Sequence, residues 1–195
     1  GLGGWGLAVV CAAKVLRLVC WGAAERTGTA RAALQRGVDR YTHVDLYIRD
    51  ADAVNSLFSR YGASIALVVH TAAQPSHDWA AREPLTDFSV NATGTFNTLK
   101  VTVPVLISQG RGGAIVVVSS VAGLRGLPFL SDYSASKHAI TGLAKSVANE
   151  IAQHRIRVNT IHPASVPTGM TTPELFPLVA GAAHTLGPIF MNALP

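Results

Sequence analysis

Short apolar runs alternate with longer amphipathic stretches along most of this chain. Runs of strand length predict strands at residues 43–48, 64–70, 114–119 and 157–162, with a weaker candidate at 15–21. Between them, apolar residues spaced three and four apart predict helices over 51–61, 88–108 and 133–154. Gly62 and Gly110 are the expected ends of the first two helices.

Strands that alternate with helices indicate βαβ units joined by right-handed crossovers. We therefore predict an α/β fold, a three-layer Rossmann-like, doubly wound and mostly parallel sheet, in one domain over residues 1–195. Residues 1–40 form an atypical start. Residues 165–195 hold five of the ten prolines, which predicts a loop-rich tail.

The composition suits a buried sheet, because 49% of the residues are hydrophobic and only 14% are charged. Two cysteines, Cys11 and Cys20, make no disulfide framework and lack the spacing of a zinc or redox pair, so we expect a cytoplasmic protein. The apolar stretch 7–24 is interrupted by Lys14 and Arg17. We therefore expect no membrane span.

The net charge of +5 is concentrated near the start of the chain. Residues 14–40 contain six basic and two acidic side chains, which leaves +4 in that stretch. Such a stretch can attract nucleic acid, or it can be a solvated segment. Because Trp21 is the one aromatic residue in residues 14–40 and no series of stacking aromatics alternates with the charges, we favour the solvated segment and expect no nucleic-acid partner.

The strongest candidate for chemistry is Tyr133-Ser134-Ala135-Ser136-Lys137, at the start of a predicted helix. A spacing of four residues puts Tyr133 and Lys137 on one face of the helix, one turn apart. An ammonium group beside a phenol stabilises the phenolate. We therefore expect Lys137 to lower the pKa of Tyr133 and to make its hydroxyl a usable acid or base near neutral pH.

Ser120 follows the predicted strand 114–119 and precedes Tyr133 by a glycine-containing loop. Reactive groups in open α/β sheets gather beyond the carboxyl ends of the strands. The Ser120 hydroxyl is suited to hydrogen-bond a substrate oxygen on which charge develops. A helix cap or a loop hydrogen bond is the alternative interpretation.

These residues belong to a longer pattern that resembles the short-chain dehydrogenase/reductase family. Three segments match in order and at the family's spacing, namely 112–123, 133–137 and 157–163. The resemblance implies that Ser120, Tyr133 and Lys137 are catalytic. It implies that the tyrosine is the general acid or base, that the lysine also holds the nicotinamide ribose, and that the serine orients the reacting carbonyl or hydroxyl.

Residues 149–170 are similar to single-domain NAD-dependent members of the carveol-dehydrogenase type. This resemblance implies cofactor contacts from Pro163, Val166 and Thr168.

The middle of the chain carries a second resemblance. Residues 70–79 and 91–97 are similar to the extended branch of the same superfamily, and most of all to nucleotide-sugar epimerases of the CDP-paratose type. The resemblance implies that Asn91 supports a proton-relay water next to the lysine; a hydrogen bond to helix backbone is the alternative. The cofactor-binding residues that it adds are Thr71, Ala72 and Ala73.

The start of the chain departs from the family pattern. Gly1-Leu2-Gly3-Gly4-Trp5-Gly6 fits the fingerprint G-x-G-x-x-G, so Gly3, Gly4 and Gly6 are cofactor-binding candidates. The apolar pattern predicts no strand ahead of these glycines in the sequence given, and in the extended-branch alignment the third glycine position falls on Val9. We expect an atypical cofactor site in a domain that is incomplete at both ends.

Together the motifs predict an enzyme, an NAD(P)-dependent oxidoreductase that transfers hydride between NAD or NADP and an alcohol or carbonyl of a small-molecule substrate. The alternatives are a nucleotide-sugar epimerase or dehydratase and a non-catalytic Rossmann-like fragment. The resemblance also implies a homodimer or homotetramer that pairs through helices 88–108 and 133–154. The seven histidines show no metal-ligand spacing, so we expect no metal.

Overall fold

The structure is a computed structural model that describes residues 8–12, 17–22, 41–45, 47–62, 65–70, 84–127 and 130–164. Its strands are β1 (Ala8–Ala12), β2 (Arg17–Gly22), β3 (Tyr41–Asp45), β4 (Ile65–His70), β5 (Gly113–Val118) and β6 (Ile156–Ile161). Its α-helices are α2 (Ala51–Tyr61), α4 (Pro84–Phe88), α5 (Gly94–Gln109) and α6 (Ser131–Ile151). A π-helical segment η3 (Ser89–Thr93) and two 3-10 turns, η4 (Val121–Gly123) and η5 (Ala152–His154), complete the set.

Most elements lie where the apolar pattern predicts them. Helix α2 has the predicted bounds, and Asp50 caps it by accepting a hydrogen bond from the Ala53 amide at 3.0 Å. The helix predicted over 88–108 is longer at its start, because α4, η3 and α5 follow one another without a break from Pro84. Gly62 and Gly110 end their helices as predicted, and Gly110 does so in the left-handed conformation.

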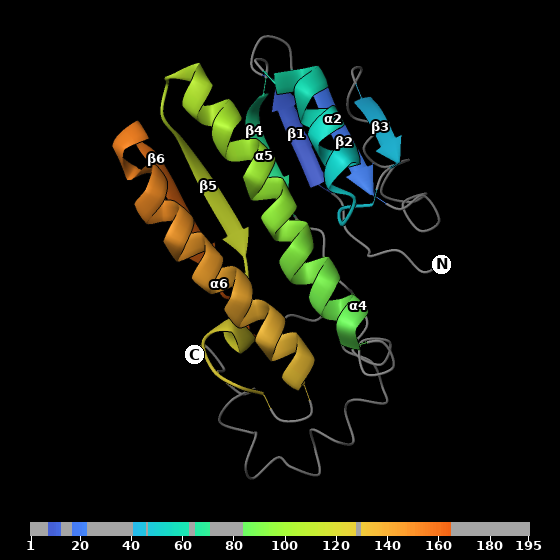
Figure 1. Ribbon diagram of the computed structural model, residues 1–195, viewed down its shortest axis with the longest axis vertical. Coiled ribbons are helices and arrows are strands. Elements are labelled where there is room, and N and C mark those ends of the chain that lie inside the picture. Colours follow the sequence, from blue (N-terminus) through green and yellow to red (C-terminus); the bar gives the residue numbers. More distant parts are fainter. Residues whose placement is uncertain are drawn as a thin grey trace, which may run out of the picture.

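The strands are ordered β3-β2-β1-β4 in one sheet and β5-β6 in a second (Figure 1). Taken across both sheets, this is the strand order of a doubly wound Rossmann-type fold. The pairs β2–β3 and β5–β6 are parallel, as predicted.

Strand β1 differs from the prediction in its position and direction. The apolar pattern predicts no strand at residues 8–12, and β1 is antiparallel to both β2 and β4. Only four residues separate β1 from β2, which is too few for a parallel crossover and enough for an antiparallel hairpin. The reversal puts Ala8, where β1 begins, opposite Trp21 and His70 near the carboxyl ends of β2 and β4.

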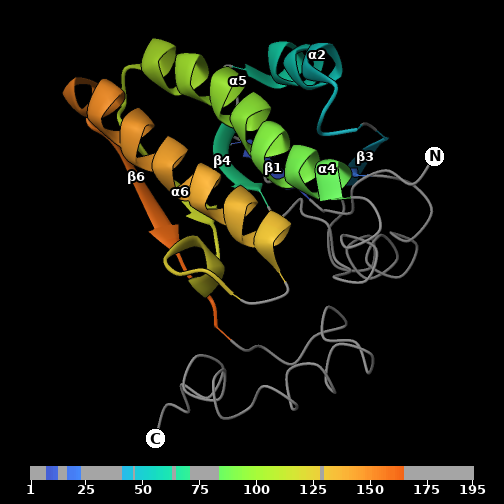
Figure 2. The same cartoon turned by 60° about the horizontal axis from the view of Figure 1, so that its bottom comes forward.

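Of the three predicted layers, the described residues form two: the strands and one layer of helices that lies on a single face (Figure 2). Two apolar clusters join these layers. The first packs Val54 and Phe58 of α2 against Val90 of η3. The second packs helices α5 and α6 against the β5–β6 pair, with Ile140 and Ile156 near its centre. Burial of this apolar surface is the main term that holds the helices on the sheet.

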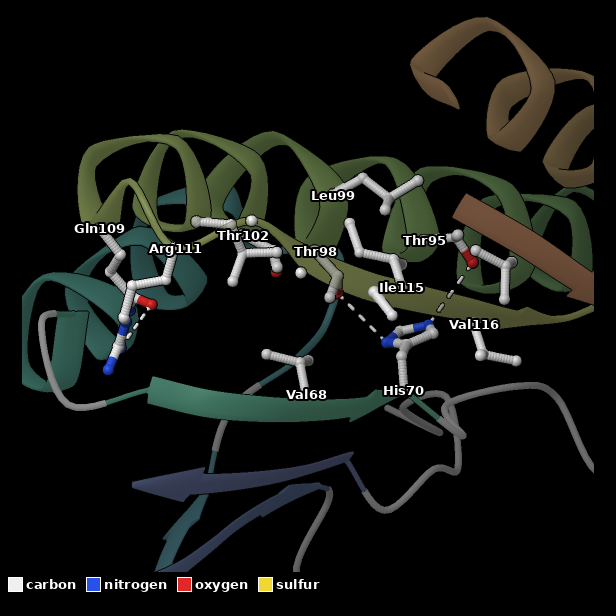
Figure 3. A pocket seen from close by; sticks show the side chains of 15 residues that line it. Val68, His70, Thr95, Thr98, Leu99, Thr102, Gln109, Arg111, Ile115 and Val116 are labelled. Atoms are coloured by element: carbon white, nitrogen blue, oxygen red, sulfur yellow. Dashed lines mark hydrogen bonds between the residues drawn. The ribbon is translucent and has the colours of Figure 1, made fainter. Parts of the chain in front are cut away.

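A cavity of about 230 Å³ lies between β4, α5 and β5 (Figure 3). Its walls are mainly apolar, with Val68 from β4 and Ile115 from β5, and three threonines of α5 line one side. His70 stands at one end, where its ring is hydrogen-bonded to Thr98. None of the described helices is both long enough and apolar enough to cross a membrane.

Candidate active site

Ser120 and Tyr133 meet just beyond the carboxyl end of β5. Ser120 caps turn η4, because its Oγ accepts a hydrogen bond from the Ala122 amide at 3.2 Å. The same side chain is hydrogen-bonded to the Tyr133 side chain. Ser120 can therefore form a loop hydrogen bond and still take part in catalysis. Its hydroxyl oxygen accepts from the Ala122 amide, and the same hydroxyl contacts Tyr133.

Helix α6 is fixed against the end of β5 at the turn that carries Lys137. The Ser119 hydroxyl donates to the Lys137 carbonyl at 3.1 Å, and Thr141 donates to the same carbonyl at 2.8 Å. Gly123 faces this turn closely, because a Cβ added there would lie only 2.7 Å from the Lys137 carbonyl oxygen. The Ser119 hydrogen bond and the close approach of Gly123 thus fix the position of the α6 turn that carries Tyr133 and Lys137.

Lys137 and Tyr133 are both buried, with 5% and 9% of their surfaces exposed. The Lys137 Nζ lies 5.4 Å from the centre of the Tyr133 ring. Burial lowers the pKa of Lys137 to about 8, and the nearby Asp87 carboxylate opposes that shift.

The expected effect of Lys137 on Tyr133 is not observed. Burial raises the pKa of the Tyr133 hydroxyl, the Ser120 hydrogen bond opposes this, and the Asp87 carboxylate adds to it. The prediction of a lowered pKa was wrong because desolvation of the phenolate outweighs the stabilising contacts in the free protein.

Asn91 lies in the π-helical segment η3 and is almost fully buried. Its Nδ2 donates to both carboxylate oxygens of Asp87 and to the Ser136 Oγ, each at 3.1 Å. Ser136 precedes Lys137, so the Asn91 amide reaches from η3 to the turn of α6 that bears the lysine. In these contacts the Asn91 amide is bonded to two side chains, those of Asp87 and Ser136.

The sequence motifs do not point to two acidic residues near the site, Asp87 and Asp132. Asp87 is fully buried, and burial together with the charge of Asp132 raises its pKa to about 6, against the opposing effects of Lys137 and Asn91. One carboxylate oxygen of Asp132 is buried without a hydrogen-bond partner among the described residues. The available sequence signal was the spacing of four residues between Asp87 and Asn91, which places them on one helical face.

His70 ends β4, and its ring contacts two threonines of α5. Its ring nitrogens lie 3.4 Å from Thr95 Oγ1 and 3.2 Å from Thr98 Oγ1. Burial lowers its pKa to about 4, and the charge of Lys137 contributes. The imidazole is therefore neutral near pH 7 and adds no second positive charge beside Lys137.

Of the remaining predicted cofactor residues, Pro163 is the one that lies within the described residues. The Pro163 carbonyl accepts from the Val121 amide at 3.0 Å, and His162 Nδ1 lies 2.9 Å from the Ser120 carbonyl oxygen. These contacts join the carboxyl ends of β5 and β6 at the site. The predicted cofactor residues that lie outside the described residues are Gly3, Gly4, Gly6, Thr71, Ala72, Ala73, Val166 and Thr168.

Comparison with known proteins gives one consistent family. The short chain dehydrogenase family matches residues 4–175. An uncharacterised NAD-dependent oxidoreductase of Mycobacterium tuberculosis is 45% identical over 121 residues, which are 57% of this chain and 44% of that protein. The (-)-trans-carveol dehydrogenase of Rhodococcus erythropolis is 49% identical over 85 residues, which are 44% of this chain and 31% of that protein.

A crystal structure of a short chain dehydrogenase from Mycobacterium paratuberculosis bound to NAD superposes with a TM-score of 0.61 and 32% identity. The superposition covers 85% of this chain and 63% of that one. The strand order, the serine–tyrosine–lysine group and these matches agree on a Rossmann-type oxidoreductase fold. The chain belongs to the short chain dehydrogenase family, and it spans about half the length of the curated relatives it matches.

The carveol-dehydrogenase resemblance is confirmed by these matches. The family match also runs through the middle of the chain, where the epimerase resemblance stays a prediction.

Proposed function

We propose that this chain carries the reaction centre of an NAD(P)-dependent dehydrogenase or reductase that acts on an alcohol or carbonyl of a small molecule. The observation that supports this most directly is the convergence of Ser120, Tyr133 and Lys137. Ser120 lies at the end of β5, and the other two lie one turn apart at the start of α6. A phenol beside a hydroxyl and a buried ammonium is a proton-transfer group with a substrate anchor.

The described residues fit a nicotinamide cofactor. The ammonium of Lys137 has three donors and lies beside the phenol on the inner face of α6, which suits the paired hydroxyls of a ribose. When bound, the cofactor supplies or accepts the hydride. The protein's own side chains bind the ribose, orient the substrate oxygen and transfer the proton.

Tyr133 gives its hydroxyl proton to the carbonyl oxygen in reduction and takes the alcohol proton in oxidation. The Ser120 oxygen already accepts from the Ala122 amide, so its proton is available to donate to Tyr133 or to the substrate oxygen. Lys137 holds the ribose. Asn91 supports the relay water beside Lys137, from a position fixed by its bonds to Asp87 and Ser136.

The cofactor-binding part of the proposal includes the glycine stretch despite its unusual place before a strand. Because β1 is reversed, Ala8 is paired with His70 at the carboxyl end of β4. Gly6 precedes Ala8 by two residues in the sequence, and Rossmann-type folds bind ligands beyond the carboxyl ends of their strands. The pyrophosphate contacts are assigned to Gly3, Gly4 and Gly6. The other contacts are assigned to Thr71, Ala72, Ala73, Pro163, Val166 and Thr168.

Self-association through helices 88–108 and 133–154 is part of the same proposal, as is a cytoplasmic setting. Three large apolar side chains are exposed in or just before the first of these helices: Leu85 and Phe88 of α4 and Phe96 of α5. An exposed group of this kind is typical of a surface that another chain covers. Analytical ultracentrifugation of the wild-type chain and of Phe96→Ser tests it, because a dimer would dissociate more readily in the variant.

A fluorescence titration with NADH and NADPH tests the proposed function first. Saturable binding that Lys137→Met weakens, and that the matched surface variant Lys145→Met on the same helix leaves unchanged, is the expected result. Absence of binding by the folded chain would reject the proposal in favour of a non-catalytic fragment. Turnover is then measured with NAD or NADP and a set of alcohols that starts from carveol. A CDP-sugar in the same set tests the epimerase alternative by product analysis.

A further inference from the structure

Asp87 is a buried carboxylate that the four proposed catalytic residues leave unexplained. It lies in α4, has none of its surface exposed, and faces helix α6. An ionisable carboxyl group is almost never fully buried unless it is paired or hydrogen-bonded, because removing its charge from water is costly. Its neighbours therefore indicate what it does.

The donor and the acceptor of each hydrogen bond around Asp87 can be assigned. The Ser136 hydroxyl donates its only proton to the Tyr133 carbonyl at 2.8 Å, so its oxygen is left to accept. The carboxylate of Asp87 also accepts. The side-chain nitrogen of Asn91, which contacts both groups at 3.1 Å, must therefore donate one proton to each. This fixes the orientation of the Asn91 amide without any choice between its oxygen and nitrogen.

The charged groups that face Asp87 come mainly from helix α6. Lys137 and Asp132 both interact with its charge, Tyr133 is affected by it, and Asn91 of η3 donates to it. The charge of Lys137 also acts on His70 of β4, which is neutral near pH 7 because its pKa is lowered to about 4. Asp87 is thus the negative group that opposes the effect of burial on the Lys137 ammonium.

We propose that Asp87 is a positioning residue of this site, whose carboxylate holds the Asn91 side chain in place and keeps the buried Lys137 in its charged form. The inference deepens the proposed function, because Lys137 is the group assigned to the ribose. An asparagine at position 87 would retain one acceptor oxygen for Asn91 but would remove the charge. A leucine would remove both contributions.

The charge of Lys137 can be measured without cofactor or substrate. The full chain is labelled with ¹³Cε-lysine, and the titration of each lysine is followed by NMR, with Lys137 assigned by its loss in Lys137→Met. We expect Asp87→Asn to move the Lys137 midpoint to lower pH, because the charge that favours the ammonium is gone. Glu150→Gln is the matched control, because it removes an equal charge from an exposed position on the same helix. The Lys137 midpoint in this control should be that of the wild type.

An unchanged Lys137 midpoint in Asp87→Asn would overturn the proposal, and so would an equal shift in Glu150→Gln. A second measurement needs no variant. Because the pKa of Asp87 is raised to about 6, the wild-type Lys137 signal should show a second, smaller inflection near that pH. Its absence would also overturn the proposal. If neither NADH nor NADPH binds, the proposed function fails while this titration still reports on Asp87.

Discussion

The Lys137 ammonium lies 5.4 Å from the centre of the Tyr133 ring, one helical turn further along α6. At that distance the charge is attracted to the face of the aromatic ring. In the free protein the pKa of the Tyr133 hydroxyl is raised, with burial as its main cause. Tyr133 is therefore protonated at neutral pH, which prepares it to act as an acid in carbonyl reduction.

The first prediction concerns the Tyr133 hydroxyl. Tyr133→Phe keeps the ring and its packing but removes the group that transfers the proton. We expect turnover to fall by about 10²–10⁴-fold, with NADH binding retained. Steady-state rates and a fluorescence titration measure the two effects. Tyr47→Phe, at a tyrosine that is 53% exposed, is the control and should be fully active. Wild-type turnover in Tyr133→Phe would contradict the assignment.

The second prediction concerns Ser120, whose hydrogen bond lowers the pKa of Tyr133 against the effect of burial. Ser120→Ala should therefore raise the pKa of Tyr133 further. If alcohol oxidation needs the phenolate, its rate should rise with pH and reach its plateau at higher pH in the variant. Ultraviolet difference titration of tyrosinate, with Tyr133→Phe as the blank, measures the same shift without substrate. A lower or unchanged pKa would show that the serine bond has no such role.

The sequence was a good guide to the elements around β5 and α6. A run of β-branched residues, a helix of clear periodicity and a serine beyond the strand lie close together in the chain, so local pattern decides their arrangement. The contact between Ser120 and Tyr133 follows from the short loop that joins these elements. The local pattern could not give the pKa of Tyr133, which depends on how completely Ala122, Leu127 and Leu130, the residues that cluster with it, exclude water from the phenol.

Two other features required the three-dimensional structure. Strand β1 owes its reversed direction to the short connection with β2, and an apolar pattern carries no information on strand direction. Asp87 and Lys137 are fifty residues apart and belong to helices that pack together only in the folded chain. A carboxylate in an amphipathic segment is usually solvated, so its burial is not readable from sequence.

The third prediction concerns His70 and acid stability. Its pKa is about 4 in the folded protein, whereas a histidine in an unfolded chain titrates near 6.5. As pH falls from 6.5 towards 4, the unfolded chain takes up a proton that the folded protein excludes, so His70 lowers the free energy of unfolding in that range. His70→Gln should remove this decrease in the free energy of unfolding between pH 6.5 and 4.

Urea unfolding at several pH values measures the effect of His70, with the exposed His138→Gln as the control. The raised pKa of Asp87 acts in the opposite sense between about pH 6 and 4, because the folded protein then takes up the proton first. Asp87 is present in both variants and in the wild type, so the differences between them isolate the histidine. A wild-type pH dependence in His70→Gln would contradict the prediction.

The fourth prediction concerns Gly123, where the η4 loop meets α6. A Cβ at this position would lie 2.7 Å from the Lys137 carbonyl and 2.8 Å from Thr141 Oγ1, so the loop must move away. We expect Gly123→Ala to destabilise the fold by about 1–3 kcal/mol and to lower activity by displacing Ser120. Gly126→Ala, in the same loop with nothing within 4 Å of the new carbon, should be close to wild type. Equal thermal stability of the two variants would show that the contact is not tight.

The fifth prediction compares two threonines on the same face of α5 (Figure 3). Thr102 is 3% exposed, and its hydroxyl has no hydrogen-bond partner among the described residues, although it lines the cavity beside β5. Thr98 lies one turn earlier, and its hydroxyl donates to the Gly94 carbonyl at 3.0 Å and contacts the His70 ring at 3.2 Å. The two side chains have the same shape and differ in whether their hydroxyls are satisfied.

Thr→Val exchanges the hydroxyl for a methyl group, so it should have opposite effects at these two positions. Thr102→Val removes an unsatisfied polar atom and should raise the free energy of unfolding by about 1 kcal/mol. Thr98→Val leaves the His70 nitrogen without its contact and should lower it by about 1–2 kcal/mol. Denaturant unfolding of both variants measures the difference. If Thr102→Val is destabilised as much as Thr98→Val, the Thr102 hydroxyl has a partner such as a bound water in the cavity, and the cavity is hydrated.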